Sequence, residues 1–327
     1  LTGFALPLDA LLANLLSPVV LAFVLGAFAA LVRSDLKLPD ALYSALSIYL
    51  LLAIGLKGGV ALSKTPLSEF AGPAGMTLFL GVLTPLTAYW VLRKLLRMDL
   101  VNSAALAAHY GSVSAVTFIA ALAFADAIGQ SAEGFMPALV ALLEVPAIVV
   151  ALMLAFVKGD RAGSWRKALH EVLTGKSVIL LVGGLVIGWI AGEAGFAPIA
   201  PFFKAGFQGA LLLFLLEMGI VAASRLRDVK KAGWPFVAFA IGIAIVHGAL
   251  GVAGGLLSGL EPSGAAVLGA MVSSASYIAA PAAVRIALPE ASPSLYLTGA
   301  LGLTFPFNIT LGIPLYFWMA SHLSPLF

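Results

Sequence analysis

Two clusters of small and hydroxyl-bearing residues form the part of this sequence best suited to bind an ion. The clusters are His109-Tyr110-Gly111-Ser112-Val113-Ser114 and Ser273-Ser274-Ala275-Ser276-Tyr277. Helices rich in Gly and Ser are easily broken, and Ala280-Pro281 follows the second cluster. A broken helix presents free backbone N–H groups that bind small anions. The predicted substrate-binding residues are Gly111, Ser112, Val113, Ser273, Ser274, Ala275 and Ser276.

Hydroxyl and freed carbonyl oxygens at the same depth could hold a hard cation such as Na⁺ beside the anion. The alternative explanation is that the small residues serve only close helix packing. The two clusters occupy equivalent places in the two halves of the chain, and this favours binding.

Several ionisable or strongly polar side chains lie inside apolar stretches, where they are costly and functional by default. Glu144, which Pro146 follows, marks an irregular helix and is a candidate for ion binding or for a structural hydrogen bond. Lys57 either reaches the membrane interface or pairs with a carboxylate such as Glu144. The other candidates for ion binding or coupling are His109, Ser114, Tyr277, Asn308 and, more weakly, Glu217.

The composition restricts the class of protein that carries these residues. Of 327 residues, 61% are hydrophobic and only 10% are charged, which excludes a soluble enzyme, a disordered chain and a nucleic-acid binder. Without cysteine there is no disulfide, thiolate metal site or thiol nucleophile. An intramembrane protease built on Ser112 and His109 or His247 is disfavoured because Gly-Ser pairs are common in such helices. We therefore expect a polytopic α-helical membrane protein that is not an enzyme and has no metal site or organic cofactor.

Ten apolar segments are long enough to cross a bilayer, and none shows the alternation of a β-barrel. They cover about 15–32, 41–62, 73–92, 101–125, 135–157, 177–192, 203–224, 234–258, 263–286 and 295–321. The odd-numbered loops contain 15 of the 18 Lys and Arg residues. Because cationic loops stay in the cytoplasm, both termini are predicted outside a plasma (inner) membrane. No basic region opens the chain, so no signal peptide is expected.

The second half of the chain repeats the first at an offset of about 160 residues. Asn102-Ser103-Ala104-Ala105-Leu106 before the first cluster matches Ser263-Gly264-Ala265-Ala266-Val267 before the second. Five spans per repeat give opposite topologies, and inverted repeats are typical of secondary transporters. The predicted parts are a first repeat over 1–157, a cytoplasmic linker with a short amphipathic helix over 158–176, and an inverted second repeat over 177–327.

The ordered motifs resemble the SbtA-type sodium-dependent bicarbonate transporter family from the first span to the last. These motifs are Ile54-Gly55-Leu56-x-Gly58-Gly59, Gly111-Ser112-Val113-Ser114, Glu144-x-Pro146-Ala147, Pro281-x-x-x-Arg285-x-Ala287-Leu288-Pro289 and Ile313-Pro314-Leu315. The resemblance implies a ten-helix 5+5 inverted-repeat fold with broken helices 4 and 9, and a core domain that moves against a gate domain. It also implies bicarbonate and Na⁺ bound where the broken helices meet, a homotrimer among membrane lipids, and a PII-like cytoplasmic regulator.

Three positions depart from the best-known members of that family. Tyr277 and Lys57 stand where those members have Asp and Thr, and Glu144 stands where they have Asp. A lost carboxylate and a gained ammonium make the site more positive, and a fixed ammonium can physically replace a bound cation. On the sequence alone, the coupling ion is therefore Na⁺ or a proton, or transport requires no coupling ion.

The sequence predicts a secondary transporter that imports bicarbonate, coupled to Na⁺, by rocking of the core against the gate. Three alternatives stay open. The first is a symporter of another small anion such as a short carboxylate. The second is a cation/proton antiporter that uses Glu144 and Lys57, and the third is a membrane sensor that binds the anion without moving it.

Overall fold

The computed structural model describes residues 8–156 and 164–326, whose regular elements are all helices, with no strand among them. The helices of the first half are α1 (Leu8–Leu15), α2 (Pro18–Leu31), α3 (Asp40–Leu62), α4 (Leu67–Lys94), α5 (Leu100–Gly111), α6 (Ala115–Ala127) and α7 (Met136–Phe156). Those that follow are α8 (Ser164–Leu173), α9 (Lys176–Phe196), α10 (Ala200–Ala205), α11 (Phe207–Ser224), α12 (Leu226–Ala232), α13 (Trp234–Leu257), α14 (Pro262–Ser273) and α15 (Ala279–Ala287). The last segment comprises α16 (Pro293–Leu297), η1 (Thr298–Thr304), α17 (Phe305–Phe307), η2 (Asn308–Gly312), α18 (Ile313–Leu323) and η3 (Ser324–Leu326).

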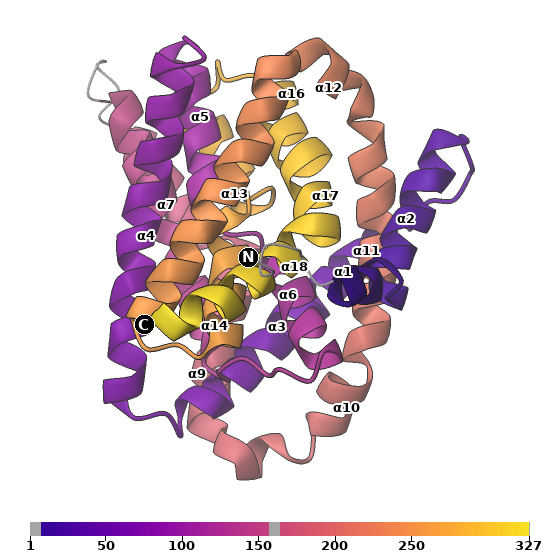
Figure 1. Cartoon of the computed structure of the whole chain (residues 1–327), viewed down its shortest axis with the longest axis vertical. Helices are drawn as coiled ribbons and strands as arrows, with labels where there is room; N and C mark the ends of the chain where they lie inside the picture. The colour runs from indigo at the N-terminus through magenta and orange to yellow at the C-terminus, as the bar shows by residue number, and fades with distance from the viewer. Residues whose placement is uncertain (1–7, 157–163, 327) are drawn as a thin grey trace.

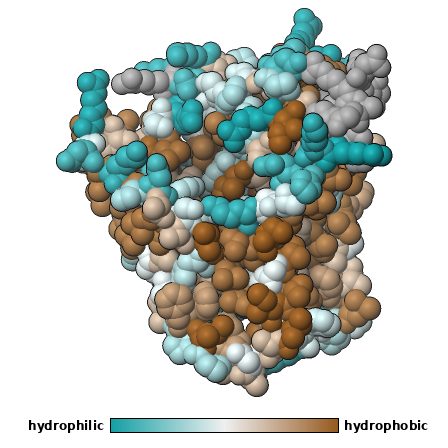
Figure 2. All heavy atoms as spheres, turned by 180° about the vertical axis from the view of Figure 1, so that it is seen from behind, coloured by the Kyte–Doolittle hydropathy of each residue, from teal (hydrophilic) through white to brown (hydrophobic). Residues whose placement is uncertain are grey.

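Seven helical segments are long and apolar enough to cross a membrane, and three shorter apolar helices (18–31, 136–151 and 262–273) accompany them among the described residues. The expected membrane protein is thus all-helical. Figure 2 shows a broad hydrophobic surface over the lower body, with hydrophilic side chains gathered at the upper end. That end is where the cationic helix α12 lies in Figure 1. Part of the expected linker, 158–163, lies outside the described residues.

Four helices form two close pairs, α2 with α11 and α3 with α9 (Figure 1). Glycines make this approach possible. A side chain on Gly26 of α2 would meet the Leu216 carbonyl of α11, and one on Gly55 of α3 would lie 2.9 Å from the Gly184 Cα of α9. Small residues at such contacts let membrane helices pack through their backbones.

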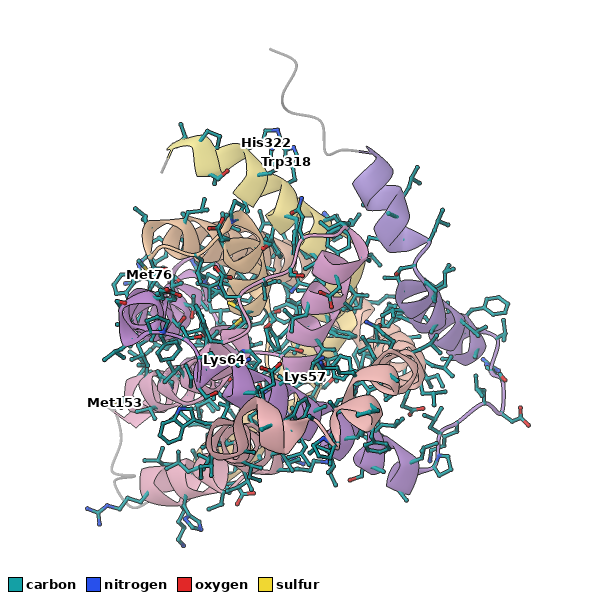
Figure 3. The ribbon with its side chains drawn as sticks, turned by 90° about the horizontal axis from the view of Figure 1, so that it is seen from below. Lys57, Lys64, Met76, Met153, Trp318 and His322 are labelled. Carbon is teal, nitrogen blue, oxygen red and sulfur yellow. The ribbon has the colours of Figure 1, made fainter. Side chains whose placement is uncertain are left out.

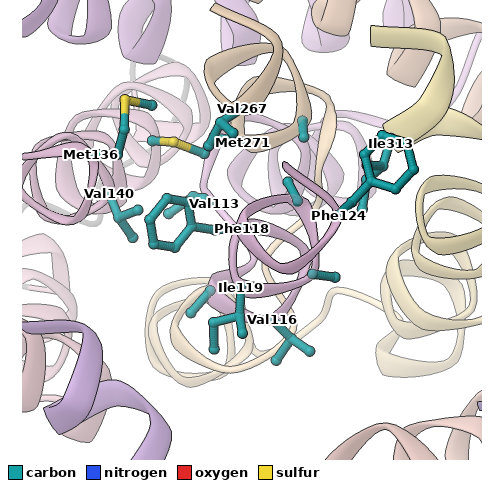
Figure 4. Packing of buried hydrophobic residues seen from close by; sticks show 14 of the residues in the cluster. Val113, Val116, Phe118, Ile119, Phe124, Met136, Val140, Val267, Met271 and Ile313 are labelled. Carbon is teal, nitrogen blue, oxygen red and sulfur yellow. The ribbon is translucent and has the colours of Figure 1, made fainter. Parts of the chain in front are cut away.

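Helices α5 and α6 belong to one hydrophobic segment that is interrupted at 112–114, and α14 and α15 are interrupted at 274–278. Ser112 and Ser114 have extended backbone angles (ψ 158° and 109°), so the chain leaves the helix and re-enters it. An 18-residue window of the segment over 100–127 is 94% buried, and the segment packs against α4, α7 and α14. Figure 4 shows Phe118 of α6 packed with Met136 of α7 and Met271 of α14.

The last apolar segment contains two π-helical stretches, η1 and η2, on either side of α17. Prolines at 306 and 314 lack the N–H that an α-helix needs, which explains the irregular hydrogen bonding here. Helix α1 supplies hydrogen-bond donors to carbonyls of this irregular stretch. Asn14 of α1 is buried, and its amide Nδ2 donates to the carbonyls of Ile309 (2.9 Å) and Thr310 (3.0 Å).

Candidate functional site

The two helix interruptions meet each other inside the protein. The Ser114 N–H donates to Ser274 Oγ at 2.8 Å, and the Ser276 N–H donates to the His109 carbonyl at 2.8 Å. Both bonds join positions about 160 residues apart in the chain. The clusters expected to act together are therefore in direct contact.

The serine hydroxyls at this crossing stabilise backbone groups that the interruptions leave free. Ser114 Oγ caps α6 by accepting the Thr117 N–H (3.2 Å), and Ser276 Oγ accepts the Ala280 N–H (3.2 Å) at the start of α15. Ser112 Oγ donates to the backbone carbonyl of Glu144 (3.3 Å). All three serines are buried, so each hydroxyl fixes the course of the backbone and remains beside the crossing.

Gly111, Val113 and Ala275 are buried small or apolar residues of the same crossing. A Cβ on Gly111 would lie 2.7 Å from Pro85 Cδ and 2.9 Å from Ala147 Cβ. Glycine is required here because α5 approaches both α4 and α7 closely.

A small cavity of about 10 Å³ lies at the crossing, enough for one water molecule. It is lined by Val113, Ser114, Ala115, Glu144, Ser177, Ser276, Tyr277 and Ile278. Glu144 of α7 is only 3% exposed, and its Oε2 has no hydrogen-bond partner among the described residues. A buried carboxylate in this state is costly unless a cation or a proton accompanies it.

The N-termini of α6 and α15 both begin at this cavity. The first turn of a helix has N–H groups without intrahelical partners and a partial positive charge. The cavity therefore combines donors for an anion with carboxylate and hydroxyl oxygens for a hard cation.

His109 and Asn308 lie away from this cavity lining. The His109 ring stacks on Tyr296 at 4.4 Å, and its Nδ1 donates to the Ala105 carbonyl at 2.6 Å. Asn308 accepts a hydrogen bond from Tyr316 (Oη to Oδ1 3.0 Å), and its Nδ2 donates to the Ser273 carbonyl (3.4 Å). Asn308 thus connects η2 to the end of α14.

Lys57 does not approach Glu144. Its Nζ lies 4.7 Å from the centre of the Phe207 ring, in a separate cavity between α3, α6 and α11. Glu217 accepts the Leu38 N–H at 3.2 Å, so it stabilises the connection that precedes α3. Tyr277 lines the small cavity and packs edge-on against Phe305 at 5.4 Å.

Ser177, in the first turn of α9, is a lining residue that the sequence analysis missed as a site residue. It is buried although Lys176 precedes it. A hydroxyl at the start of an apolar span is common at helix ends, so the pattern alone could not single it out. Its contact with the crossing depends on the packing of α9 against α7.

The all-helical fold of the described residues, the apolar spans and a buried polar crossing fit a membrane transport protein. The family model of the Na⁺-dependent bicarbonate transporter superfamily matches residues 18–321, which is most of the chain. The chain therefore belongs to this superfamily, as its motifs predict. The curated proteins include no match to the chain.

Proposed function

We propose that this protein imports bicarbonate together with Na⁺ and that both ions bind at the crossing of the two interrupted helices. The observation that carries the proposal is the cavity shared by the N-termini of α6 and α15, the Glu144 carboxylate and the serine hydroxyls. Membership of a Na⁺-dependent bicarbonate transporter superfamily supports the two substrates.

The anion is held by the first-turn N–H groups of α6 and α15, with hydroxyls of the two serine clusters completing its hydrogen bonds. A planar anion with several oxygen acceptors suits converging N–H donors. The cavity of about 10 Å³ is too small for bicarbonate. Binding therefore requires that the helices around the crossing separate.

The cation is held by Glu144 and neighbouring oxygens. A carboxylate beside an anion site repels the anion unless a positive charge intervenes. Na⁺ at Glu144 would remove this repulsion, so that the two ions bind together and cross together. The hydroxyl of Ser177 adds a ligand from α9, which packs on α3 outside the crossing helices.

The contacts at the ends of the interrupted helices support a 5+5 inverted repeat. Ser263 Oγ donates to the Ser131 carbonyl, and the Ser292 N–H donates to Asn102 Oδ1, both at 2.8 Å. These pairs are equivalent under one offset, because 292 − 131 = 161 and 263 − 102 = 161. A residue of each half thus forms a hydrogen bond with the start of the interrupted helix in the other half.

The paired helices also follow this symmetry, since α2 packs on α11 as α3 packs on α9. We assign α2, α3, α9 and α11 to the gate domain and the helices around the crossing to the core domain, with the linker over 158–176. Movement of the core against the gate gives alternating access. If the cationic ends of the helices face the cytoplasm, both termini lie on the outer side of the plasma membrane. The homotrimer and the PII-like regulator rest on the family resemblance.

The decisive experiment measures uptake of labelled bicarbonate by proteoliposomes under an inward Na⁺ gradient and with Na⁺ replaced by K⁺. We expect uptake that requires Na⁺ and is lost in Ser274→Ala, because Ser274 both donates to Met271 O (2.7 Å) and accepts the Ser114 N–H. Ser321→Ala is the matched control, since this exposed serine donates only to its own helix turn.

The outcome also separates the alternatives. Uptake that is indifferent to Na⁺ would point to a proton or to no coupling ion. Uptake of formate or acetate in place of bicarbonate would keep the anion site but change the substrate. Binding of bicarbonate without uptake under either gradient would refute the transport proposal and favour a sensor.

A further inference from the structure

A second and much larger cavity, of about 900 Å³, opens between α3, α6, α7, α9, α10 and α11. It lies at the end of the molecule where α3 and α9 end and α7 and α11 begin. This end is opposite the cationic loops. Under the proposed orientation the cavity faces the outside, on the side from which an imported anion arrives.

Lys57 lies near the inner end of this cavity. The lining residues of α3 run from Ile54 through Lys57 to Ala61, a rise of about 10 Å, and Lys64 follows at the opening. Figure 3, which views the molecule from this end, shows Lys57 and Lys64 close to its centre. The face of the Phe207 ring, 4.7 Å from Lys57 Nζ, fixes the position of the ammonium group.

The charges of the cavity are balanced in number but not in position. The described lining contains Lys57, Lys64, Lys204, Asp126, Glu133 and Glu193. Lys64 forms an ion pair with Glu193, and Glu133 Oε1 accepts the Glu261 N–H (2.7 Å) at the start of α14.

Asp126 is the remaining carboxylate, and it lies one turn nearer the opening than Leu122 on α6. Among the described residues, no carboxylate is within ion-pairing distance of Lys57. The innermost charged group is therefore a cation that forms no ion pair among the described residues, and Asp126 acts on it only from a longer distance. Walls of low dielectric constant focus its field into the cavity and raise the local anion concentration.

We propose that this cavity is a capture vestibule in which the Lys57 ammonium binds a small inorganic anion before the anion reaches the crossing. The inference rests on the proposed function for the identity of that anion, bicarbonate. It assigns to Lys57 a role in anion entry that is separate from cation coupling at Glu144. Lys57 then affects the rate of transport at low anion concentration more than it affects the maximal rate.

The test uses the absence of cysteine from the chain, so that one introduced thiol is the only reactive one. Ala123→Cys places a thiol on the cavity wall. In proteoliposomes, we compare its rates of reaction with an anionic and a neutral methanethiosulfonate reagent added from outside. We expect a preference for the anionic reagent that falls on the order of tenfold in Lys57→Met. Lys64→Met is the matched control and should change it less than about twofold, because Lys64 is already paired with a carboxylate.

A transport measurement accompanies the labelling. Lys57→Met should raise the KM for bicarbonate on the order of tenfold with a smaller effect on the maximal rate, and Lys57→Arg should restore the KM. The vestibule proposal is wrong if no external reagent reaches the thiol at position 123. It is also wrong if Lys57→Met leaves the reagent preference unchanged. Both conclusions hold even if the wild type transports bicarbonate. A preference that depends on Lys57 in a protein that transports no bicarbonate supports anion capture and refutes the proposed substrate instead.

Discussion

Replacing Glu144 by glutamine tests the cation site most directly, because it removes the charge and keeps the side-chain volume. A hard cation roughly 2.4 Å from a carboxylate oxygen gains roughly 7 kcal/mol at an effective dielectric constant of about 20. Loss of hydration by both ions offsets a large part of this attraction. A net loss of about 3 kcal/mol corresponds to on the order of 100-fold in the Na⁺ concentration for half-maximal uptake.

The assay is labelled bicarbonate uptake in proteoliposomes as a function of external Na⁺, for wild type, Glu144→Gln and Glu144→Asp. The aspartate variant keeps the charge on a shorter side chain, so it should need more Na⁺ than wild type and less than the glutamine variant. Glu217→Gln is the matched control. Its carboxylate already accepts the Leu38 N–H, and an amide oxygen can accept the same bond.

A Glu144→Gln protein with the wild-type Na⁺ dependence would refute this reasoning. The unpartnered Oε2 would then have no role in coupling, and the cation would have to bind elsewhere. Full loss of uptake at every Na⁺ concentration, with the protein still folded, would show that Glu144 is also needed for the anion.

Three further predictions concern stability in detergent, measured by thermal unfolding. Gly111→Ala should lower the melting temperature, at a cost of about 1–3 kcal/mol for the overpacked crossing, whereas Gly209→Ala, with open space around it, should not. Asn14→Asp keeps the side-chain volume but cannot donate to the η2 carbonyls, so it should lower the free energy of unfolding by roughly 1–3 kcal/mol. An unchanged melting temperature would contradict a stabilising role for these two hydrogen bonds. Burial, with a smaller effect of a neighbouring carboxylate, raises the pKa of Glu133, which lies in the connection between α6 and α7. The contribution of Glu133 to the stability of the fold is therefore present below the carboxyl's unfolded pKa and is lost as pH rises through its folded pKa. Glu133→Gln should make the melting temperature fall less over this pH range.

The class and family of the protein were predictable because they depend on composition and on ordered motifs. A bilayer requires long apolar helices, and several long apolar windows are visible in the sequence. The superfamily match over 18–321 confirms the family that the motifs indicate. The helix interruptions could be anticipated as well, since Gly, Ser and Pro weaken helices locally and the interruptions at 112–114 and 274–278 overlap the two clusters.

Contacts between distant segments could not be predicted from those patterns. Asn308 and His109 look like ion ligands in sequence because both are polar and lie in apolar segments. In the structure Asn308 joins Ser273 and Tyr316, and His109 stacks on Tyr296. Ser177 was missed for the opposite reason, because only the packing of α9 brings its ordinary hydroxyl to the cavity. Lys57 could be recognised as unusual, but its distance from Glu144 follows from the separate cavity that it lines.

The contacts that complete the crossing also determine the order in which this chain can fold during synthesis. Ser114 and Asn102 find their partners at Ser274 and Ser292, which the ribosome adds more than 150 residues later. Until then the interrupted helix of the first half has unsatisfied polar groups in the bilayer. The first half should therefore remain open to rearrangement and to quality-control proteases until α14 and α15 have been inserted. A chain truncated after residue 176 should be degraded in the cell even though it contains several long apolar helices.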